Sequence, residues 1–122
     1  MNKAQALHSF WNSFGIPAYD SSTVPSEEDR GDFYITYEVA TDSLDRAVSL
    51  SASIWKTNTY SWKDVSDKAE EISDELIQVK SIPLDIGFLY ITRGTPFAQR
   101  MFDENETTRR IYINVIAEFL AP

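Results

Sequence analysis

The sequence predicts an α+β fold in which two helices pack on one face of a four-stranded sheet, in the order α-β-β-α-β-β. Two segments repeat apolar residues at helical spacing, one segment alternates apolar residues with serine, and two later segments are apolar on both faces. With 122 residues, of which 43% are hydrophobic, the chain can bury one core. We therefore expect a single domain over residues 1–122.

The first predicted helix spans Lys3 to Phe14. Asn2 can cap it, because Gln5 stands three residues later and can reach back in a capping box. Gly15 and the proline that follows it at position 17 end the helix. Its apolar stripe consists of Ala4, Leu7, Trp11 and Phe14. Residues 16–31 are polar and acidic, so we expect a surface connection there.

Two strands are predicted next, Phe33 to Ala40 and Ala47 to Lys56, joined by a turn over residues 41–46. The second strand alternates serine with apolar residues, which are Val48, Leu50, Ala52 and Ile54. This alternation is typical of a strand that is covered on one side only.

The second predicted helix begins after Ser61, which can act as its cap with Asp64 three residues later. A single apolar stripe follows it, made of Trp62, Val65, Ala69, Ile72 and Leu76. Pro83 stops any extension. If the strand before this helix and the strand after it are parallel neighbours, the helix forms a right-handed crossover between them.

The last two predicted strands are Leu84 to Arg93 and Thr108 to Leu120. Both carry apolar residues on both faces, so we expect them to be central in the sheet or covered by a partner. Residues 94–107 between them are predicted to form a long loop, and such loops tend to be functional or mobile. Its apolar residues either fold back on the core or dock on a neighbour.

Charge is unevenly distributed along the chain. The net charge of −8 disfavours tight binding of nucleic acid as a whole. The second helix holds six acids and two lysines, which gives −4, half of that total. Four arginines bracket the predicted loop: Arg93, Arg100, Arg109 and Arg110. Either these arginines pair locally with Asp103, Glu104 and Glu106, or an acidic and a basic patch meet head to tail between copies.

Nothing in the sequence points to catalysis. The chain has no cysteine, and its single histidine, His8, lies beside an apolar stripe, where a boundary residue with a satisfied ring is expected. It contains no phosphate-binding glycine loop and no calcium-loop spacing. We predict that it is not an enzyme and needs no metal or cofactor. No signal peptide or membrane span is predicted, so synthesis and residence in a cytoplasm are expected.

Several segments, in order, resemble a family of small neck proteins of long-tailed bacteriophages and prophages, often described as minor capsid or tail terminator-like proteins. The similarity includes the segments Leu7–Tyr19, Phe33–Glu38, Ser49–Trp55, Ser61–Trp62 and Ile91–Gln99. It implies a virion protein, made in the host bacterial cytoplasm, that closes the head-proximal end of the tail tube as a ring. The ring would usually be a hexamer that joins the tail tube protein to a head-completion protein. DNA would pass through it without specific binding, and no catalytic residue carries over.

Two sets of candidate functional residues follow. The candidate partner or subunit interface comprises Trp55, Tyr60, Arg93, Pro96, Phe97, Arg100, Met101 and Phe102. Trp55 falls on the serine face of its strand and is expected to be partly exposed, whereas Trp62 is assigned to the core. The candidate channel-facing residues are Asp67, Glu70, Asp74 and Glu75. An acidic channel would repel DNA and keep it mobile, and the alternative is that this helix face points outward to solvent.

Two other classes of function remain open. An acidic DNA mimic would inhibit a basic, nucleic-acid-binding host protein and would stay a monomer or dimer. A small enzyme or ligand-binding module would need a well-formed apolar pocket. The two-sided apolar strands favour assembly over mimicry, because a mimic needs acids on its surface rather than apolar strands.

Overall fold

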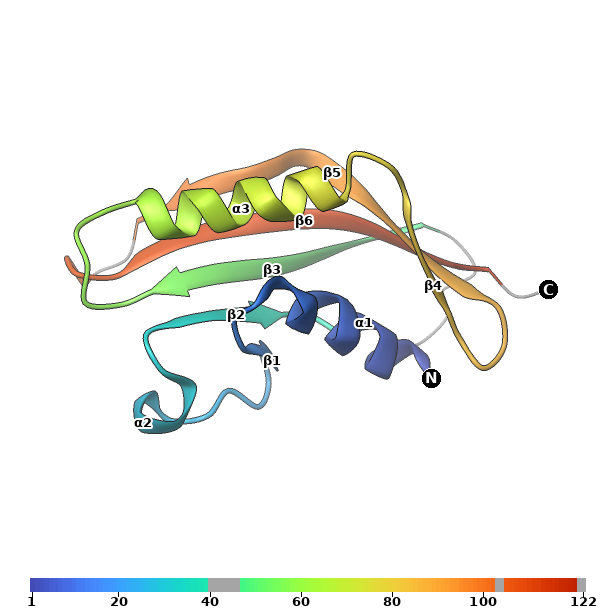
Figure 1. The fold of residues 1–122 in the computed structure, drawn as a ribbon, viewed down its shortest axis with the longest axis horizontal. Coiled ribbons are helices and arrows are strands. Elements are labelled where there is room, and N and C mark those ends of the chain that lie inside the picture. Colours follow the sequence, from blue (N-terminus) through green and yellow to red (C-terminus); the bar gives the residue numbers. More distant parts are fainter. Residues whose placement is uncertain (40–46, 103–104, 121–122) are drawn as a thin grey trace.

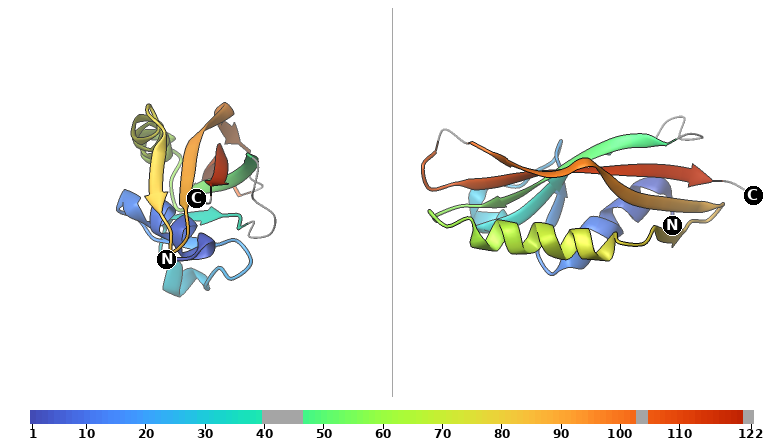
Figure 2. Two further views of the ribbon diagram at one scale, coloured as in Figure 1. Left: turned by 90° about the vertical axis from the view of Figure 1, so that its right-hand side faces the viewer. Right: turned by 90° about the horizontal axis from the view of Figure 1, so that it is seen from above.

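The computed structural model describes residues 1–39, 47–102 and 105–120 (Figure 1). Within them the elements follow in the order α1 (Lys3–Trp11), η1 (Asn12–Phe14), β1 (Ala18–Asp20), α2 (Glu27–Arg30), β2 (Phe33–Tyr37), β3 (Val48–Lys56), α3 (Lys63–Glu75), β4 (Lys80–Pro83), β5 (Phe88–Met101) and β6 (Arg109–Leu120). The strands form one six-stranded sheet in the order β1-β2-β3-β6-β5-β4. Only the β1–β2 pair is parallel, and the sheet is mixed and curled (Figure 2).

The predicted four-stranded sheet with two helices is therefore wrong. Two further strands, β1 and β4, close the two edges of the sheet, and a short helix, α2, lies in the segment predicted as a surface connection. Strands of three and four residues are too short to show a period of two. Pro83, which was interpreted only as a stop for the preceding helix, ends β4, because an edge strand tolerates proline.

The predicted loop over residues 94–107 is also wrong, because β5 continues as a strand to Met101. The register between β5 and β6 shifts between Arg93 and Ala98, where the strand bulges. Gly94 is needed at this bulge, since a Cβ there would lie 2.8 Å from the Cβ of Asn114. The bulge accommodates both the glycine at position 94 and the proline at position 96 within one strand.

The condition for a right-handed crossover through α3, that the strands before and after it are parallel neighbours, is not met. β3 pairs with β6, and β6 pairs with β5, so β6 separates β3 from β5. The two strands run parallel but are not neighbours. The chain returns from α3 through the edge strand β4 before it enters β5.

The hydrophobic core lies between the sheet and the two longer helices, α1 and α3, which are on the same side of the sheet (Figure 2). The predicted alternation of β3 is confirmed, with Leu50, Ala52 and Ile54 buried. The predicted stripe of α3 is buried at Val65, Ala69, Ile72 and Leu76. Trp62 is only partly buried, so its assignment to the core holds in part.

Both longer helices, α1 and α3, begin close to the residues at which the sequence predicts them to begin. Asn2 and Gln5 form the predicted capping box at α1. At α3 the N-cap position is Trp62, which makes no side-chain cap, and Ser61 Oγ instead accepts a hydrogen bond from the backbone N–H of Lys63 at 3.1 Å. The predicted serine cap is therefore displaced by one residue.

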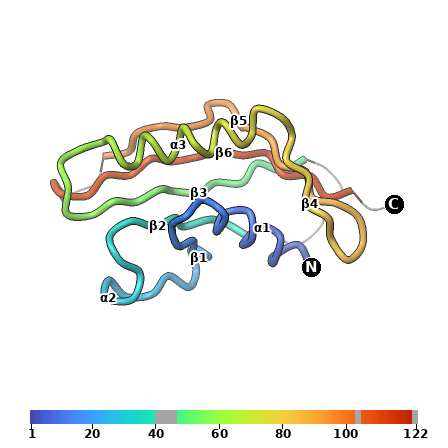
Figure 3. Tube along the Cα trace, in the orientation of Figure 1, coloured from blue at the N-terminus to red at the C-terminus, as the bar shows by residue number. Residues whose placement is uncertain are grey.

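The molecule is elongated along α3 and the central strands (Figure 3). One end holds the β3–α3 connection and the far end of β5 (Figure 1). The opposite end holds the N-terminus, the α3–β4 connection, the β4–β5 hairpin and the end of β6. This division into two ends places the candidate surfaces described below.

Candidate assembly surface

Trp55 lies on the face of the sheet opposite α1 and α3. Its Nε1 donates a hydrogen bond to Thr36 Oγ1 at 3.0 Å, and its ring stacks on Tyr34 with 6.2 Å between ring centroids. The guanidinium carbon of Arg110 lies 4.7 Å from the centre of the Trp55 ring, while Arg110 Nε donates to Ser53 Oγ. Trp55 is half-buried, which confirms the expected partial exposure. Its role in an interface stays a prediction.

A cluster of aromatic, apolar and arginine side chains occupies the end of the molecule at which α3 begins. We call it the aromatic–arginine tip, and it comprises Tyr60, Trp62, Arg100, Met101, Phe102 and Arg109. Two of its rings stand free in solvent: Phe102 is 98% exposed and Tyr60 is 71% exposed. The guanidinium carbons of Arg100 and Arg109 lie 4.7 Å and 5.3 Å from the Trp62 ring centre.

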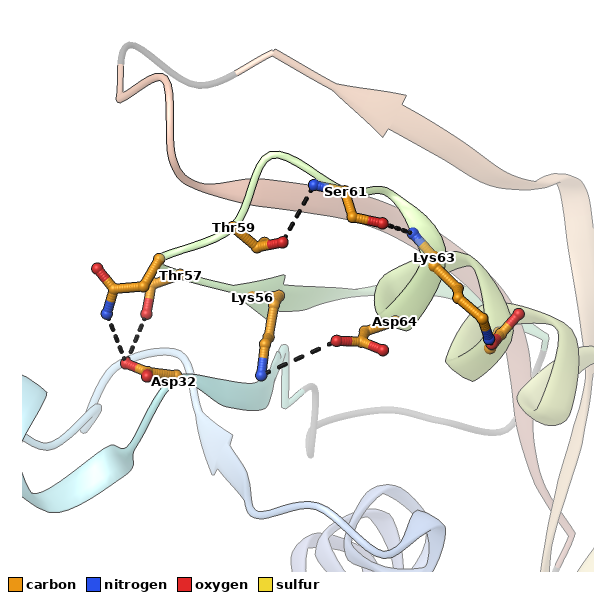
Figure 4. A network of polar contacts seen from close by, with 9 residues as sticks. Asp32, Lys56, Thr57, Thr59, Ser61, Lys63 and Asp64 are labelled. Carbon is orange, nitrogen blue, oxygen red and sulfur yellow. Dashed lines mark hydrogen bonds and ion pairs between the residues drawn. The ribbon is translucent and has the colours of Figure 1, made fainter.

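The β3–α3 connection that carries Tyr60 is fixed by a local network of polar contacts (Figure 4). Asp32 Oδ1 accepts hydrogen bonds from Thr57 Oγ1 at 2.8 Å and from the side chain of Asn58 at 3.1 Å. Arg109 Nε donates to the backbone carbonyl of Tyr60 at 3.1 Å. These contacts hold the connection against the start of β6, so the exposed Tyr60 ring projects from an ordered segment.

The remaining predicted interface residues lie elsewhere on β5. Arg93 donates to Ser73 Oγ beside α3 at 3.1 Å. The carbonyl of Pro96 accepts from Asn114 Nδ2, and Phe97 packs against the core. Phe97 thus follows the alternative in which apolar residues of this segment fold back. The structure brings Tyr60 and Phe102 to the tip, together with Arg100 and Met101, but leaves Trp55, Arg93 and Phe97 outside it.

The four candidate channel-facing acids are all exposed on α3. Asp67 pairs with Lys63, and this hydrogen bond and charge raise the pKa of Lys63. Glu75 pairs with Lys80 at 3.0 Å. Among the described residues, Glu70 and Asp74 form no ion pair.

The four arginines that bracket the predicted loop also lack acidic partners among the described residues of the subunit. In the described part of the chain, none of Arg93, Arg100, Arg109 and Arg110 forms an ion pair. Arg109 donates to the backbone carbonyl of Glu106 rather than to its carboxylate. The other two acids proposed as local partners, Asp103 and Glu104, lie outside the described residues.

A second group of exposed apolar side chains lies at the opposite end of the molecule and was missed by sequence reasoning. We call it the apolar end, and it comprises Ile77, Val79, Ile86, Phe88 and Leu120. Ile77 and Val79 directly follow α3 and are 65% and 53% exposed. The available signal was their position just beyond Leu76, where the buried stripe of the helix ends but apolar residues continue.

The single histidine is satisfied locally. His8 Nδ1 lies 2.8 Å from the Tyr37 hydroxyl, as expected for a residue at the boundary of the core. Burial raises the pKa of Tyr37, and the nearby charge of Asp20 raises it further. The described residues contain no cluster of three or more side chains suited to holding a metal ion. None of their helices is long and apolar enough to cross a membrane.

No family model matches the chain, and no curated protein sequence matches it.

Proposed function

We propose that this protein is a structural subunit that assembles with copies of itself. The observation that carries the proposal is the placement of the exposed large apolar side chains, most of which gather at the two ends of an elongated molecule with one buried hydrophobic core. Fully burying one such side chain stabilises an assembly by roughly 1.5–3 kcal/mol. Monomeric proteins rarely leave several of them together in solvent.

The resemblance to phage neck proteins supports a particular assembly. In this proposal the copies form a ring, six in number as the resemblance implies, that terminates the tail tube and joins it to head-completion proteins. The genome passes through the ring without specific binding. In this proposal the ring needs no cofactor and performs no reaction, because its role is to bind the tail tube on one face and the head-completion proteins on the other.

Electron microscopy of particles tests this role. Deletion of the reading frame from the phage genome that carries it should leave heads and tails unjoined, and supplying the intact gene in trans should restore joined particles. If the deletion mutant still makes joined, infectious particles, the protein is not a neck component.

We further propose that the polar face of α3 lines the channel. Glu70 is the residue that tests this, because it is exposed and has no ion pair among the described residues. The Glu70→Lys ring should form and join particles, but it should slow DNA ejection most at low salt, where screening is weakest. Glu28→Lys on α2 is the matched control and should eject normally. If particles that contain the Glu70→Lys ring eject DNA as fast as particles that contain the Glu28→Lys ring, the polar face of α3 does not line the channel.

A further inference from the structure

The aromatic–arginine tip and part of the apolar end lie at opposite ends of the same helix. Tyr60 and Trp62 directly precede α3, whereas Ile77 and Val79 directly follow it. With 13 residues, α3 separates the two groups by about 20 Å. The β4–β5 hairpin and the end of β6 extend past the α3 C-terminus (Figure 1), so a second copy reaches this helix end with its tip from the α3 side of the sheet, beside the hairpin.

The two surfaces are complementary in charge. The tip presents Arg100 and Arg109, which make no ion pair within the described residues. The end of α3 presents Asp74, which forms no ion pair among the described residues, and Glu75, which pairs with Lys80 of its own subunit. The partial negative charge of the helix C-terminus adds to the charge of Asp74. A contact between two tips would instead bring arginines together, and a contact between two helix ends would bring carboxylates together.

The same two surfaces also match in their apolar groups. The tip offers Phe102 and Tyr60, and the helix end offers Ile77 and Val79, all of them more than half exposed. Aromatic side chains with neighbouring arginines are the residues that most often dominate binding energy at interfaces. Because Phe102 is 98% exposed, it makes almost no contact within its own subunit that a partner would have to replace.

We infer that the aromatic–arginine tip of one copy docks on the C-terminal end of α3 in the next copy. This inference rests on the self-assembly in the proposed function, but not on its place in a phage neck. The contact is heterologous, since each copy uses one tip and one helix end, so it propagates until the chain of subunits closes into a ring. In such a ring the α3 helices follow one another around the circumference.

Two double variants test the contact by sedimentation. The tip variant carries Arg100→Glu and Phe102→Ser, and the helix-end variant carries Ile77→Ser and Val79→Ser. All four side chains are exposed, so both variants should fold, and the tip variant should lose only the small contribution of the Arg100–Trp62 contact in thermal unfolding. Wild-type protein should form closed oligomers, and each variant alone should need at least about tenfold higher concentration to associate.

Mixing the two variants is the decisive step. The helix-end variant keeps an intact tip, and the tip variant keeps an intact helix end, so one productive contact remains. The mixture should form heterodimers with wild-type affinity and nothing larger. Leu120→Ser, an exposed apolar residue outside the contact, serves as the matched control and should assemble like the wild type.

Three results would overturn the inference: wild-type protein that stays monomeric up to about 1 mM, double variants that assemble normally, or a mixture that fails to form heterodimers. These failures leave the neck role untouched, because the deletion experiment tests that role separately. Conversely, if the deletion mutant still makes joined particles, the protein has no neck role. The heterologous contact between copies would still stand if the mixing experiment had shown it.

Discussion

Replacing Gly94 by alanine should destabilise the protein by about 2–3 kcal/mol, in the upper part of the range for overpacking a buried site. The added Cβ would lie 2.8 Å from Asn114 Cβ, 2.9 Å from the Asn114 carbonyl oxygen and 3.0 Å from its carbonyl carbon. Two of these atoms belong to the backbone of β6, which is paired with β3 on one side and β5 on the other. Because β6 cannot shift without disturbing both ladders, the strain cannot be relieved by a side-chain movement.

Urea unfolding followed by tryptophan fluorescence measures this effect as a drop in the transition midpoint at unchanged slope. Gln99→Ala is the control, since Gln99 is exposed on the same strand and its loss should change the free energy of unfolding by less than about 0.5 kcal/mol. A Gly94→Ala protein as stable as this control would show that β5 and β6 do not approach each other as closely as described.

Three further predictions concern local interactions. Asn2→Ala removes one half of the capping box with Gln5 and should cost about 1 kcal/mol in urea unfolding, and an unchanged midpoint would contradict the cap. Trp62→Ala removes a half-buried ring and its contacts with Arg100 and Arg109, and should lower the unfolding free energy by roughly 2 kcal/mol. Because the folded state raises the pKa of Tyr37, the stability that depends on its neutral hydroxyl is fully present below about pH 10 and is lost as pH rises through the folded pKa. Urea unfolding at a series of alkaline pH values should therefore show a shallower loss for Tyr37→Phe than for the wild type, and equal slopes would rule out this linkage.

The elements that the sequence predicts well are those with a sustained period. The helix stripe ending at Leu76 and the serine alternation of β3 both persist for at least two turns or four residue pairs, so each specifies which face is buried. β1 and β4 have only three and four residues, and they are held by backbone pairing at the sheet edges rather than by a patterned face. No local period could reveal these two strands. Because they were left out of the prediction, the predicted sheet had four strands instead of six.

The candidate site was predictable to a similar extent. Tyr60 could be named because it lies close to Trp55 and Trp62 in the chain, and Phe102 because it lies in the segment 94–107 that was interpreted as a loop. Phe97 was grouped with them only because β5 was interpreted as a loop; in a strand, alternation sends it toward the core. Ile77 and Val79 were missed because the stripe appeared complete at Leu76, and only the structure shows that the two side chains just beyond it are exposed.

The central claim is that this chain assembles with copies of itself. The most direct test is the solution mass of the wild-type protein, measured by light scattering from micromolar concentration to about 1 mM. Self-assembly into a ring predicts that the mass rises with concentration and then stays constant at one integral multiple of the subunit, because a heterologous ring stops growing when it closes. A mass that remains that of a single subunit across the whole range would contradict it.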